Sequence, residues 1–290
     1  MSTDGNTITD NIDLTGQVAL ITGAGRGIGR TTAQFLAEAG ASVTVTARSE
    51  DQLRETVDSI ESQGGTAIAV PGDVTNRQDV RNVVAVTAEK LGPIDLLVNN
   101  AGSGLVSGPL WETDEEDWWH SVEVNLQGPF LFTRAVLPSM VSRGTGRIVN
   151  VSSGAGLQPQ ANHSAYVIAK TGLIRLTENL AVEVEKHGVK AFTVHPGTVR
   201  TAMAHAVLDS DQQKEWLPWF SPIFENGHDY APEDAAHLIR LLASGKADEF
   251  SGRYFSVEGD GVPYDDLEEM RKQTERIKED RLYFLRLRRG

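Results

Sequence analysis

Short, almost wholly apolar runs alternate along this chain with longer segments in which apolar side chains recur every three or four residues. The apolar runs predict buried strands at residues 18–22, 42–46, 67–70, 94–98, 147–151 and 190–195. The longer segments predict helices at residues 29–39, 50–63, 77–91, 114–143 and 164–187, most of which end at a glycine. Strands without a polar face, each followed by a helix, indicate an α/β protein whose parallel sheet is covered on both faces.

The alternation runs on without an internal repeat, a low-complexity tract or a linker rich in proline and serine, so we predict a single domain over residues 14–261. A disordered or loosely attached leader is expected at residues 1–13, and a charged helical tail at residues 262–290. The apolar end of that tail either docks on its own domain or contacts another subunit.

Residues 198–230 depart from the alternation, because their pattern predicts a long and irregular segment with several aromatic side chains. Irregular segments of this length in a compact domain usually serve as lids or binding loops. We therefore predict a lid that shields an apolar substrate from water. The alternative is that Trp216 and Trp219 only anchor the segment to the core.

Composition and charge narrow the possible classes of function. The 290 residues contain no cysteine, which excludes disulfides, thiolate metal sites and a cysteine nucleophile. With 27 basic and 40 acidic residues the formal net charge is −13, which disfavours binding to nucleic acid or to anionic membranes. The leader lacks the basic start and apolar core of a signal peptide, so we expect a cytoplasmic protein. The scattered histidines predict no metal site.

A glycine-rich turn, Thr22-Gly-Ala-Gly-Arg-Gly-Ile-Gly29, follows the first predicted strand and opens the first predicted helix. Glycines allow the backbone to turn sharply and to approach a pyrophosphate, and the free N–H groups of a helix N-terminus favour its negative charge. The turn could be purely structural, but its place between strand and helix favours phosphate binding.

Further motifs follow in order along the chain: Asn99-Asn-Ala-Gly102, then Ser153, Tyr166 and Lys170, then Pro196-Gly197. Together with the glycine turn, they resemble the short-chain dehydrogenase/reductase family in its common type of about 250 residues, and its 3-oxoacyl-ACP reductase-like members in particular. The resemblance runs from about Leu14 to Gly261. It implies a Rossmann-type, doubly wound parallel sheet of about seven strands, a nicotinamide dinucleotide, and a homodimer or homotetramer.

Tyr166 and Lys170 lie four residues apart in a helical pattern, so their side chains share one face. An ammonium beside a phenol favours the phenolate, so we expect Lys170 to lower the pKa of Tyr166 and to make it a general acid/base. Ser153 could hold the substrate oxygen. Taken alone, a tyrosine and a lysine at this spacing are an ordinary surface contact, and a serine at the end of a strand is usually a turn residue. The resemblance implies that Lys170 also binds the nicotinamide ribose and that Asn125 positions it through water.

The choice between NADP(H) and NAD(H) depends on the end of the second strand. An acidic side chain there would bind the ribose 2′-hydroxyl, but the family pattern places Ala47 at that position and Arg48 directly after it. An arginine can pair with a 2′-phosphate, and Arg26 could assist from the glycine turn. We therefore expect NADP(H), with NAD(H) as the alternative if Arg48 is only a solvent-exposed residue.

The resemblance implies further contacts with the dinucleotide. Asp73 and Val74 would meet the adenine, and the Asn99–Gly102 segment would lie against its ribose. Pro196, Gly197 and Thr198 would face the nicotinamide amide, and Thr201 the phosphates. The expected cofactor-binding residues are Gly23, Arg26, Gly27, Ile28, Gly29, Arg48, Asp73, Val74, Asn100, Ala101, Gly102, Tyr166, Lys170, Pro196, Gly197, Thr198 and Thr201.

The substrate pocket is expected between residues 102–108, 154–163 and 198–230. His163, three residues before Tyr166, could contact substrate, but we interpret it as a solvent-facing loop residue. His195 is interpreted as structural. The tryptophans Trp111, Trp118 and Trp119 are expected to pack around the long helix or at a subunit contact.

The sequence thus predicts an NADP(H)-dependent enzyme that interconverts a ketone or aldehyde and an alcohol, with Ser153, Tyr166, Lys170 and Asn125 as its catalytic residues. The alternatives are an NAD-dependent alcohol or hydroxysteroid dehydrogenase and a non-catalytic dinucleotide-sensing protein. Acyl thioesters, polyketides, steroids, sugars and small ketones all remain open as substrates of this predicted small-molecule enzyme.

Overall fold

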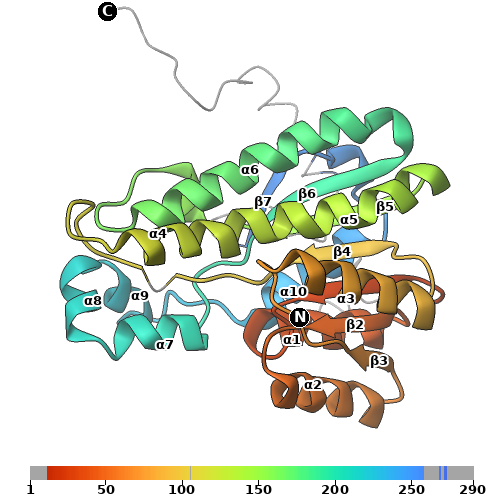
Figure 1. Cartoon of the computed structure of the whole chain (residues 1–290), viewed down its shortest axis with the longest axis horizontal. Helices are drawn as coiled ribbons and strands as arrows, with labels where there is room; N and C mark the ends of the chain where they lie inside the picture. The colour runs from red at the N-terminus through yellow and green to blue at the C-terminus, as the bar shows by residue number, and fades with distance from the viewer. Residues whose placement is uncertain (1–11, 105, 258–267, 269–270, 273–290) are drawn as a thin grey trace, which may run out of the picture.

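A computed structural model describes residues 12–104, 106–257, 268, 271 and 272 (Figure 1). These residues form a parallel sheet of seven strands in the order β3-β2-β1-β4-β5-β6-β7, which confirms the predicted doubly wound α/β fold. The strands are β1 (Val18–Thr22), β2 (Ser42–Thr46), β3 (Thr66–Ala69), β4 (Leu96–Asn99), β5 (Gly146–Val151), β6 (Val189–His195) and β7 (Tyr254–Ser256).

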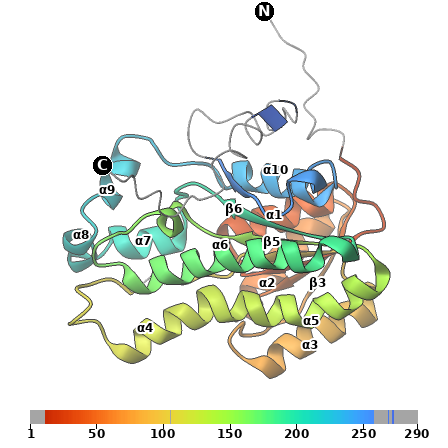
Figure 2. The ribbon, with the colours of Figure 1, turned by 90° about the horizontal axis from the view of Figure 1, so that it is seen from above.

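Helices cover both faces of this sheet (Figure 2). The main helices are α1 (Gly27–Glu38), α2 (Glu50–Ser62), α3 (Arg77–Lys90), α4 (Glu115–Val122), α5 (Gly128–Arg143), α6 (Ser164–Val184) and α10 (Pro232–Ala243). Of these helices, α1, α2 and α10 pack in one core and α3, α5 and α6 in the other. In β1, Ala19 and Ile21 belong to the first core and Val18 and Leu20 to the second, as the alternation of a strand requires. Every position of β1 is therefore buried, which explains its continuous apolar sequence.

The helix predicted over residues 114–143 is interrupted. Asp114 caps the start of α4 by accepting bonds from the backbone N–H groups of Glu116 and Asp117, and Gly144 ends α5 with a φ of 69°. Between the two helices, η1 (Glu123–Gln127) is a π-helical turn that contains the buried Asn125. Such turns insert a residue into a helix and occur often at functional sites.

Residues 198–230 are largely helical, so the prediction of an irregular segment was wrong. They contain the short helices α7 (Ala202–Leu208), α8 (Asp211–Trp216) and α9 (Phe220–Glu225). The side chains of Thr201 and Ser210 cap α7 and α8. Helices of six or seven residues span fewer than two turns, which is too little for a periodic pattern to be visible in the sequence.

The two ends of the chain are only partly described. Ile12 packs in the same core as α1, whereas the rest of the predicted leader, residues 1–11, lies outside the described residues. Most of the predicted tail lies outside them as well, but Arg271 forms an ion pair with Glu249 at 2.7 Å. Among the described residues, no helix is long and apolar enough to span a membrane.

Candidate active site

The predicted site residues lie at the carboxyl ends of the strands, where β1, β4, β5 and β6 lead into their loops. The sheet order changes direction between β1 and β4, which is the switch point at which open α/β sheets bind ligands. The segment from α7 to α9 and the start of α4 flank this end of the sheet, on the left in Figure 1. The loops that follow these strands therefore meet at one edge of the molecule.

The glycine turn between β1 and α1 requires glycine for two reasons. Gly23 and Gly27 have φ values of 65° and 53°, in the left-handed region. A Cβ atom on Gly23 would lie 2.8 Å from the Cα of Ala101, and one on Gly29 would collide with the carbonyl of Gly23. The helix that follows, α1, begins without a side-chain cap at Arg26, so its first N–H groups are free to bind an anion. The turn fits the pyrophosphate of a dinucleotide.

The end of β4 is tied to the end of β1 by side-chain hydrogen bonds. The Thr22 hydroxyl oxygen accepts bonds from the backbone N–H groups of Asn100 and Ala101, both at 3.0 Å. In return the Asn100 side chain donates to the Thr22 carbonyl at 2.9 Å. The predicted contacts Asn100, Ala101 and Gly102 thus lie directly beside the glycine turn.

Arg48 and Asp73 lie at the ends of β2 and β3. Arg48 is exposed in the bend after β2, and neither Arg48 nor Arg26 forms an ion pair with a described residue. Burial disfavours the charge on Asp73, but hydrogen bonds from Thr75 and the charge of Arg48 outweigh it and hold the pKa of this carboxyl below its usual value. The side chain of Asp73 is therefore a fixed anion that faces Arg48 at the predicted adenine end.

Three predicted catalytic residues come together near the start of α6. Tyr166 lies in the first turn of this helix, and its phenol interacts with the side chain of Ser153, which follows β5. The ammonium of Lys170 lies 5.5 Å from the centre of the Tyr166 ring and donates to the Val151 carbonyl at 2.9 Å. The neighbouring Ser152 is buried and donates to the Lys170 carbonyl at 3.1 Å, so Ser153 is the serine available to a substrate.

The pKa of Tyr166 differs from expectation. Although the side chain keeps part of its surface exposed, burial raises the pKa of this phenol above its ordinary value, and the hydrogen bond with Ser153 offsets only part of that rise. Burial also lowers the pKa of Lys170 to about 8. The prediction of a lowered Tyr166 pKa was wrong for the net shift, because burial outweighs the effect of the nearby ammonium, which binds a backbone carbonyl instead of the phenol oxygen.

Asn125 is fully buried in the π-helical turn η1. Its amide donates to the Ser121 carbonyl at 2.8 Å and to the Ser103 carbonyl at 2.5 Å, and its oxygen accepts from the Ser103 N–H at 3.3 Å. A Cβ atom on Gly102 would lie 3.1 Å from the Asn125 oxygen and 3.8 Å from the Lys170 ammonium. Asn125 therefore holds the loop after β4 against the Lys170 side chain.

The loop after β6 completes the site. Gly197 has a φ of 73°, and a Cβ atom there would collide with the Tyr230 ring. The Thr198 carbonyl accepts from the Tyr230 N–H at 2.9 Å, which holds the two ends of the 198–230 segment together. Thr201 reaches the glycine turn, because its methyl carbon would lie 3.3 Å from a Cβ atom on Gly27. The structure thus brings Thr201 and the predicted phosphate-binding turn together.

Two residues in this region were not among the predicted site residues. His163 is buried and stacks on the Tyr166 ring, so its interpretation as a solvent-facing residue was wrong. Its position three residues before Tyr166 is a signal that could have suggested a shared helix face. Met203 of α7 packs against Gly104, and a Cβ atom on Gly104 would lie 2.8 Å from its sulfur. No pattern in the sequence pointed to Met203.

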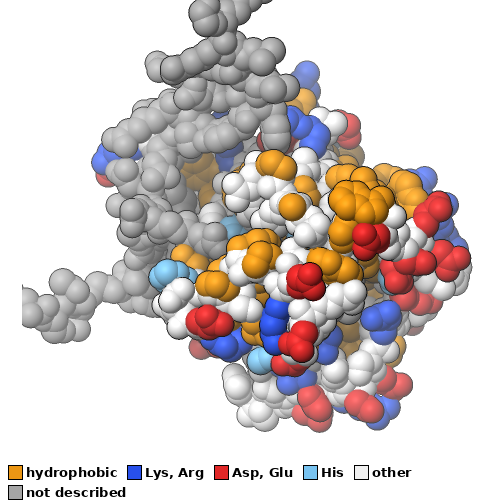
Figure 3. Space-filling view, turned by 90° about the vertical axis from the view of Figure 1, so that its left-hand side faces the viewer, with side chains coloured by type: hydrophobic (Ala, Val, Ile, Leu, Met, Phe, Trp, Pro, Cys, Tyr) orange, Lys and Arg blue, Asp and Glu red, His pale blue; other side chains and the backbone are white. Residues whose placement is uncertain are grey.

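Hydrophobic side chains gather on the end of the molecule that contains these loops, with acidic side chains along one side (Figure 3). Trp111 is 84% exposed and Trp119 is 55% exposed, so neither is buried around the long helix, and the alternative of a subunit contact stays a prediction. Trp118 does pack, and its indole N–H donates to Ser164 at 2.9 Å. The other exposed large apolar residues of these loops are Leu110, Leu157 and Trp219.

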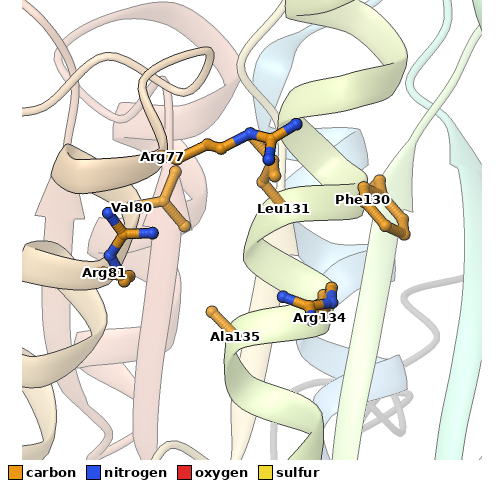
Figure 4. Close-up of a pocket in the computed structure, with 7 residues that line it drawn as sticks. All are labelled: Arg77, Val80, Arg81, Phe130, Leu131, Arg134 and Ala135. Carbon is orange, nitrogen blue, oxygen red and sulfur yellow. The ribbon is translucent and has the colours of Figure 1, made fainter.

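A separate cleft of about 390 Å³ lies between α3 and α5 (Figure 4). Its arginines come from both helices, and none of the three forms an ion pair with a described residue. None of the predicted site residues lines this cleft. It is lined by Arg77, Val80, Arg81, Phe130, Leu131, Arg134 and Ala135.

The sequence is similar to a known protein family and to several of its members. Residues 17–212 match the family model described as short chain dehydrogenase. A 3-oxoacyl-[acyl-carrier-protein] reductase of Synechocystis sp. is 38% identical over 253 residues, which cover 87% of this chain and 99% of that protein. A short chain dehydrogenase of Pseudocercospora fijiensis is 34% identical over 94% of this chain and 90% of its own length.

Among solved structures, a variant of actinorhodin polyketide ketoreductase with NADPH is 34% identical and superposes with a TM-score of 0.77, covering 84% of this chain and 96% of that one. Levodione reductase is 28% identical with a TM-score of 0.78, covering 84% and 97%. The relatives thus share both the fold and most of the length of this chain. The protein belongs to the short-chain dehydrogenase/reductase family and is an oxidoreductase of the class that interconverts alcohols and carbonyl compounds with a nicotinamide dinucleotide.

Proposed function

We propose that the protein is an NADP(H)-dependent reductase of ketones or aldehydes in which Tyr166 transfers the proton. The observation that supports this proposal most directly is the convergence of Ser153, Tyr166 and Lys170 at the carboxyl end of β5. The phenol, hydroxyl and ammonium groups of these residues lie at the ligand-binding edge of the sheet. There they can orient a carbonyl oxygen and transfer a proton to it.

The chain's own residues have distinct tasks in this reaction. Ser153 donates a hydrogen bond that orients the carbonyl oxygen, and the Tyr166 hydroxyl delivers a proton to that oxygen as the alcohol forms. The bound dinucleotide supplies the hydride that reaches the carbonyl carbon. Because burial keeps the pKa of Tyr166 above its ordinary value, the phenol stays protonated at neutral pH and is ready to act as an acid.

Lys170 supports the tyrosine from the next turn of α6. Its pKa of about 8 leaves it largely protonated at neutral pH, so it contributes a positive charge inside the site. This charge stabilises the phenolate that Tyr166 becomes after it gives up its proton. Asn125 keeps the loop after β4 against Lys170 through its bonds to Ser103.

The preference for NADP(H) is supported by the end of β2. Ala47 brings no negative charge there, and the exposed guanidiniums of Arg48 and Arg26 have no ion-pair partner among the described residues. Most other described arginines in this acidic chain pair with a carboxylate, for example Arg30 with Glu55 and Arg147 with Asp248. Two unpaired arginines flanking a predicted ribose site favour a 2′-phosphate as their partner.

The substrate proposal rests on the apolar side chains around the site. Exposed tryptophan and leucine side chains on the flanking loops favour a carbonyl compound with an apolar body over a sugar. Relatives named for 3-oxoacyl and polyketide reduction are consistent with such a compound. We therefore expect β-keto esters and cyclic ketones to be better substrates than keto sugars.

The test is reduction of a carbonyl panel, containing a β-keto ester, a cyclic ketone, an aromatic aldehyde and a keto sugar, followed by loss of NADPH absorbance. In the Tyr166→Phe variant we expect turnover to fall by a factor of about 1,000 or more, since general acid catalysis is lost. NADPH binding, measured by quenching of tryptophan fluorescence, should stay within about threefold. Turnover retained in this variant would refute the assignment of the proton donor. Tight NADPH binding by the wild-type protein without any turnover would favour the dinucleotide-sensing alternative.

A further inference from the structure

His163 lies flat against the ring of Tyr166. The centres of the two rings are 4.8 Å apart and their planes differ by 8°. His163 precedes α6 and Tyr166 lies in its first turn, so the same short segment supplies both rings. A parallel stack at this separation restricts rotation of the tyrosine ring about its own axis.

The environment keeps the imidazole of His163 neutral. The side chain is 7% exposed, and burial lowers its pKa to about 4, with the Gly104 backbone opposing part of that shift. The ammonium of Lys170, on the next turn of α6, lies 5.5 Å from the centre of the same tyrosine ring. At neutral pH an uncharged ring therefore stacks on Tyr166, and a cation lies close to the same ring.

The same histidine joins two loops of the substrate site. Its Nδ1 atom lies 3.4 Å from the side-chain oxygen of Gln160 in the loop after β5, and its ring interacts with the backbone of Gly104 in the loop after β4. A Cβ atom on Gly104 would lie 3.9 Å from the Tyr166 ring. His163 thus connects both walls of the expected pocket to the proton donor between them.

We propose that His163 is a positioning residue, which fixes the orientation of the Tyr166 ring by stacking and holds it in register with the Gly104 loop. This inference rests on the proposed role of Tyr166 as proton donor. A donor that must reach a carbonyl oxygen within hydrogen-bond distance loses efficiency when its ring can tilt, even if substrate still binds. The flat shape of the imidazole, and not its charge, is the property required.

The proposal is tested with three variants at this position. His163→Phe keeps a flat ring, His163→Leu fills space without one, and His163→Gln keeps polar groups without one. His187→Leu, at an exposed position just after the end of α6, serves as the matched control. Steady-state constants are measured with NADPH and the carbonyl compound that the wild-type protein reduces fastest, and thermal unfolding shows which variants fold.

We expect kcat of His163→Leu and of His163→Gln to fall by a factor of about 10 to 100, with KM for the carbonyl changed less than about threefold. His163→Phe should restore kcat to within about threefold of wild type. If His163→Phe folds and is as slow as His163→Leu, stacking is not the relevant property and the proposal is overturned. Rescue by His163→Gln alone would likewise overturn it in favour of a polar role.

A double variant separates this proposal from the proposed function. If His163 acts through Tyr166, adding His163→Leu to Tyr166→Phe should leave the residual turnover unchanged within about twofold. An additional loss equal to that of the single variant would show an independent effect and overturn the inference. Should Tyr166→Phe itself stay active, the proposed function fails first and the inference with it. An inactive Tyr166→Phe with a fully active His163→Leu would overturn the inference alone.

Discussion

The two halves of the site are built from different parts of the chain. Around β1 and β4, the surfaces suited to a dinucleotide are mainly backbone, set by Gly23, Gly29 and the hydrogen bonds of Thr22. Around β5 and α6, the chemistry depends on ionisable side chains that are partly or fully buried, such as Tyr166 and Lys170. The first half tolerates almost no added atoms, whereas the second depends on which atoms the side chains carry.

This difference separates binding from turnover. A change in the backbone half should remove affinity for the dinucleotide irrespective of its 2′-group, because the pyrophosphate turn is common to both forms. A change in the side-chain half should leave that affinity in place and reduce catalysis. Three further experiments test whether the two halves act separately.

The largest effect is expected from Gly29→Val. The new side chain would collide with the carbonyl of Gly23 and the side chain of Asn100, so the glycine turn must open. We expect affinity for NADPH and for NADH to fall by a factor of about 100 or more, as measured by fluorescence titration. Thr31→Val on the same helix is the control and should bind both normally. Near-normal affinity in a folded Gly29→Val protein would show that the turn is not the binding element.

An intermediate effect on stability is expected from pH. His163 has a folded pKa of about 4 against an ordinary value of 6.5, so the unfolded chain takes up a proton more readily than the folded one. The contribution of the neutral His163 to the free energy of unfolding is therefore fully present above pH 6.5. It is lost as the pH falls from 6.5 towards 4, by on the order of 3 kcal/mol.

Chemical denaturation at several pH values measures this loss. His163→Phe has no proton to take up, so its stability should decline less than that of the wild-type protein over the same interval. Parallel declines in the two proteins would place the acid sensitivity elsewhere. Because the glycine turn holds no histidine, this sensitivity would belong to the side-chain half of the site alone.

The smallest effect is expected from Arg48→Ala, because the side chain is exposed and water screens its charge. Affinity for NADPH should fall about tenfold and affinity for NADH less than twofold, because only NADPH carries the 2′-phosphate that Arg48 would contact. Arg54→Ala, an exposed arginine on α2 that pairs with Glu50, is the control. Equal losses for the two dinucleotides would remove the support for NADP(H).

Much of the fold could be predicted from the sequence because its signals are local. The six apolar runs predicted as strands correspond to β1 through β6, and glycines mark the ends of helices as expected, as at Gly144. Other elements were missed because their determinants are not periodic. The helices α7 to α9 are too short for a pattern, and the π-helical turn at Asn125 follows from contacts with the Ser103 backbone instead of from its own sequence.

Residue type and spacing within one segment were enough to predict the order of elements, the glycine turn and the set Ser153, Tyr166 and Lys170. Tertiary packing, in contrast, places His163 on Tyr166 and Met203 against Gly104, and the burial that results raises the pKa of Tyr166. Burial depends on which distant segments pack over a residue. No local pattern specifies that packing, because it arises when the loops after β4, β5 and β6 meet at one edge of the sheet.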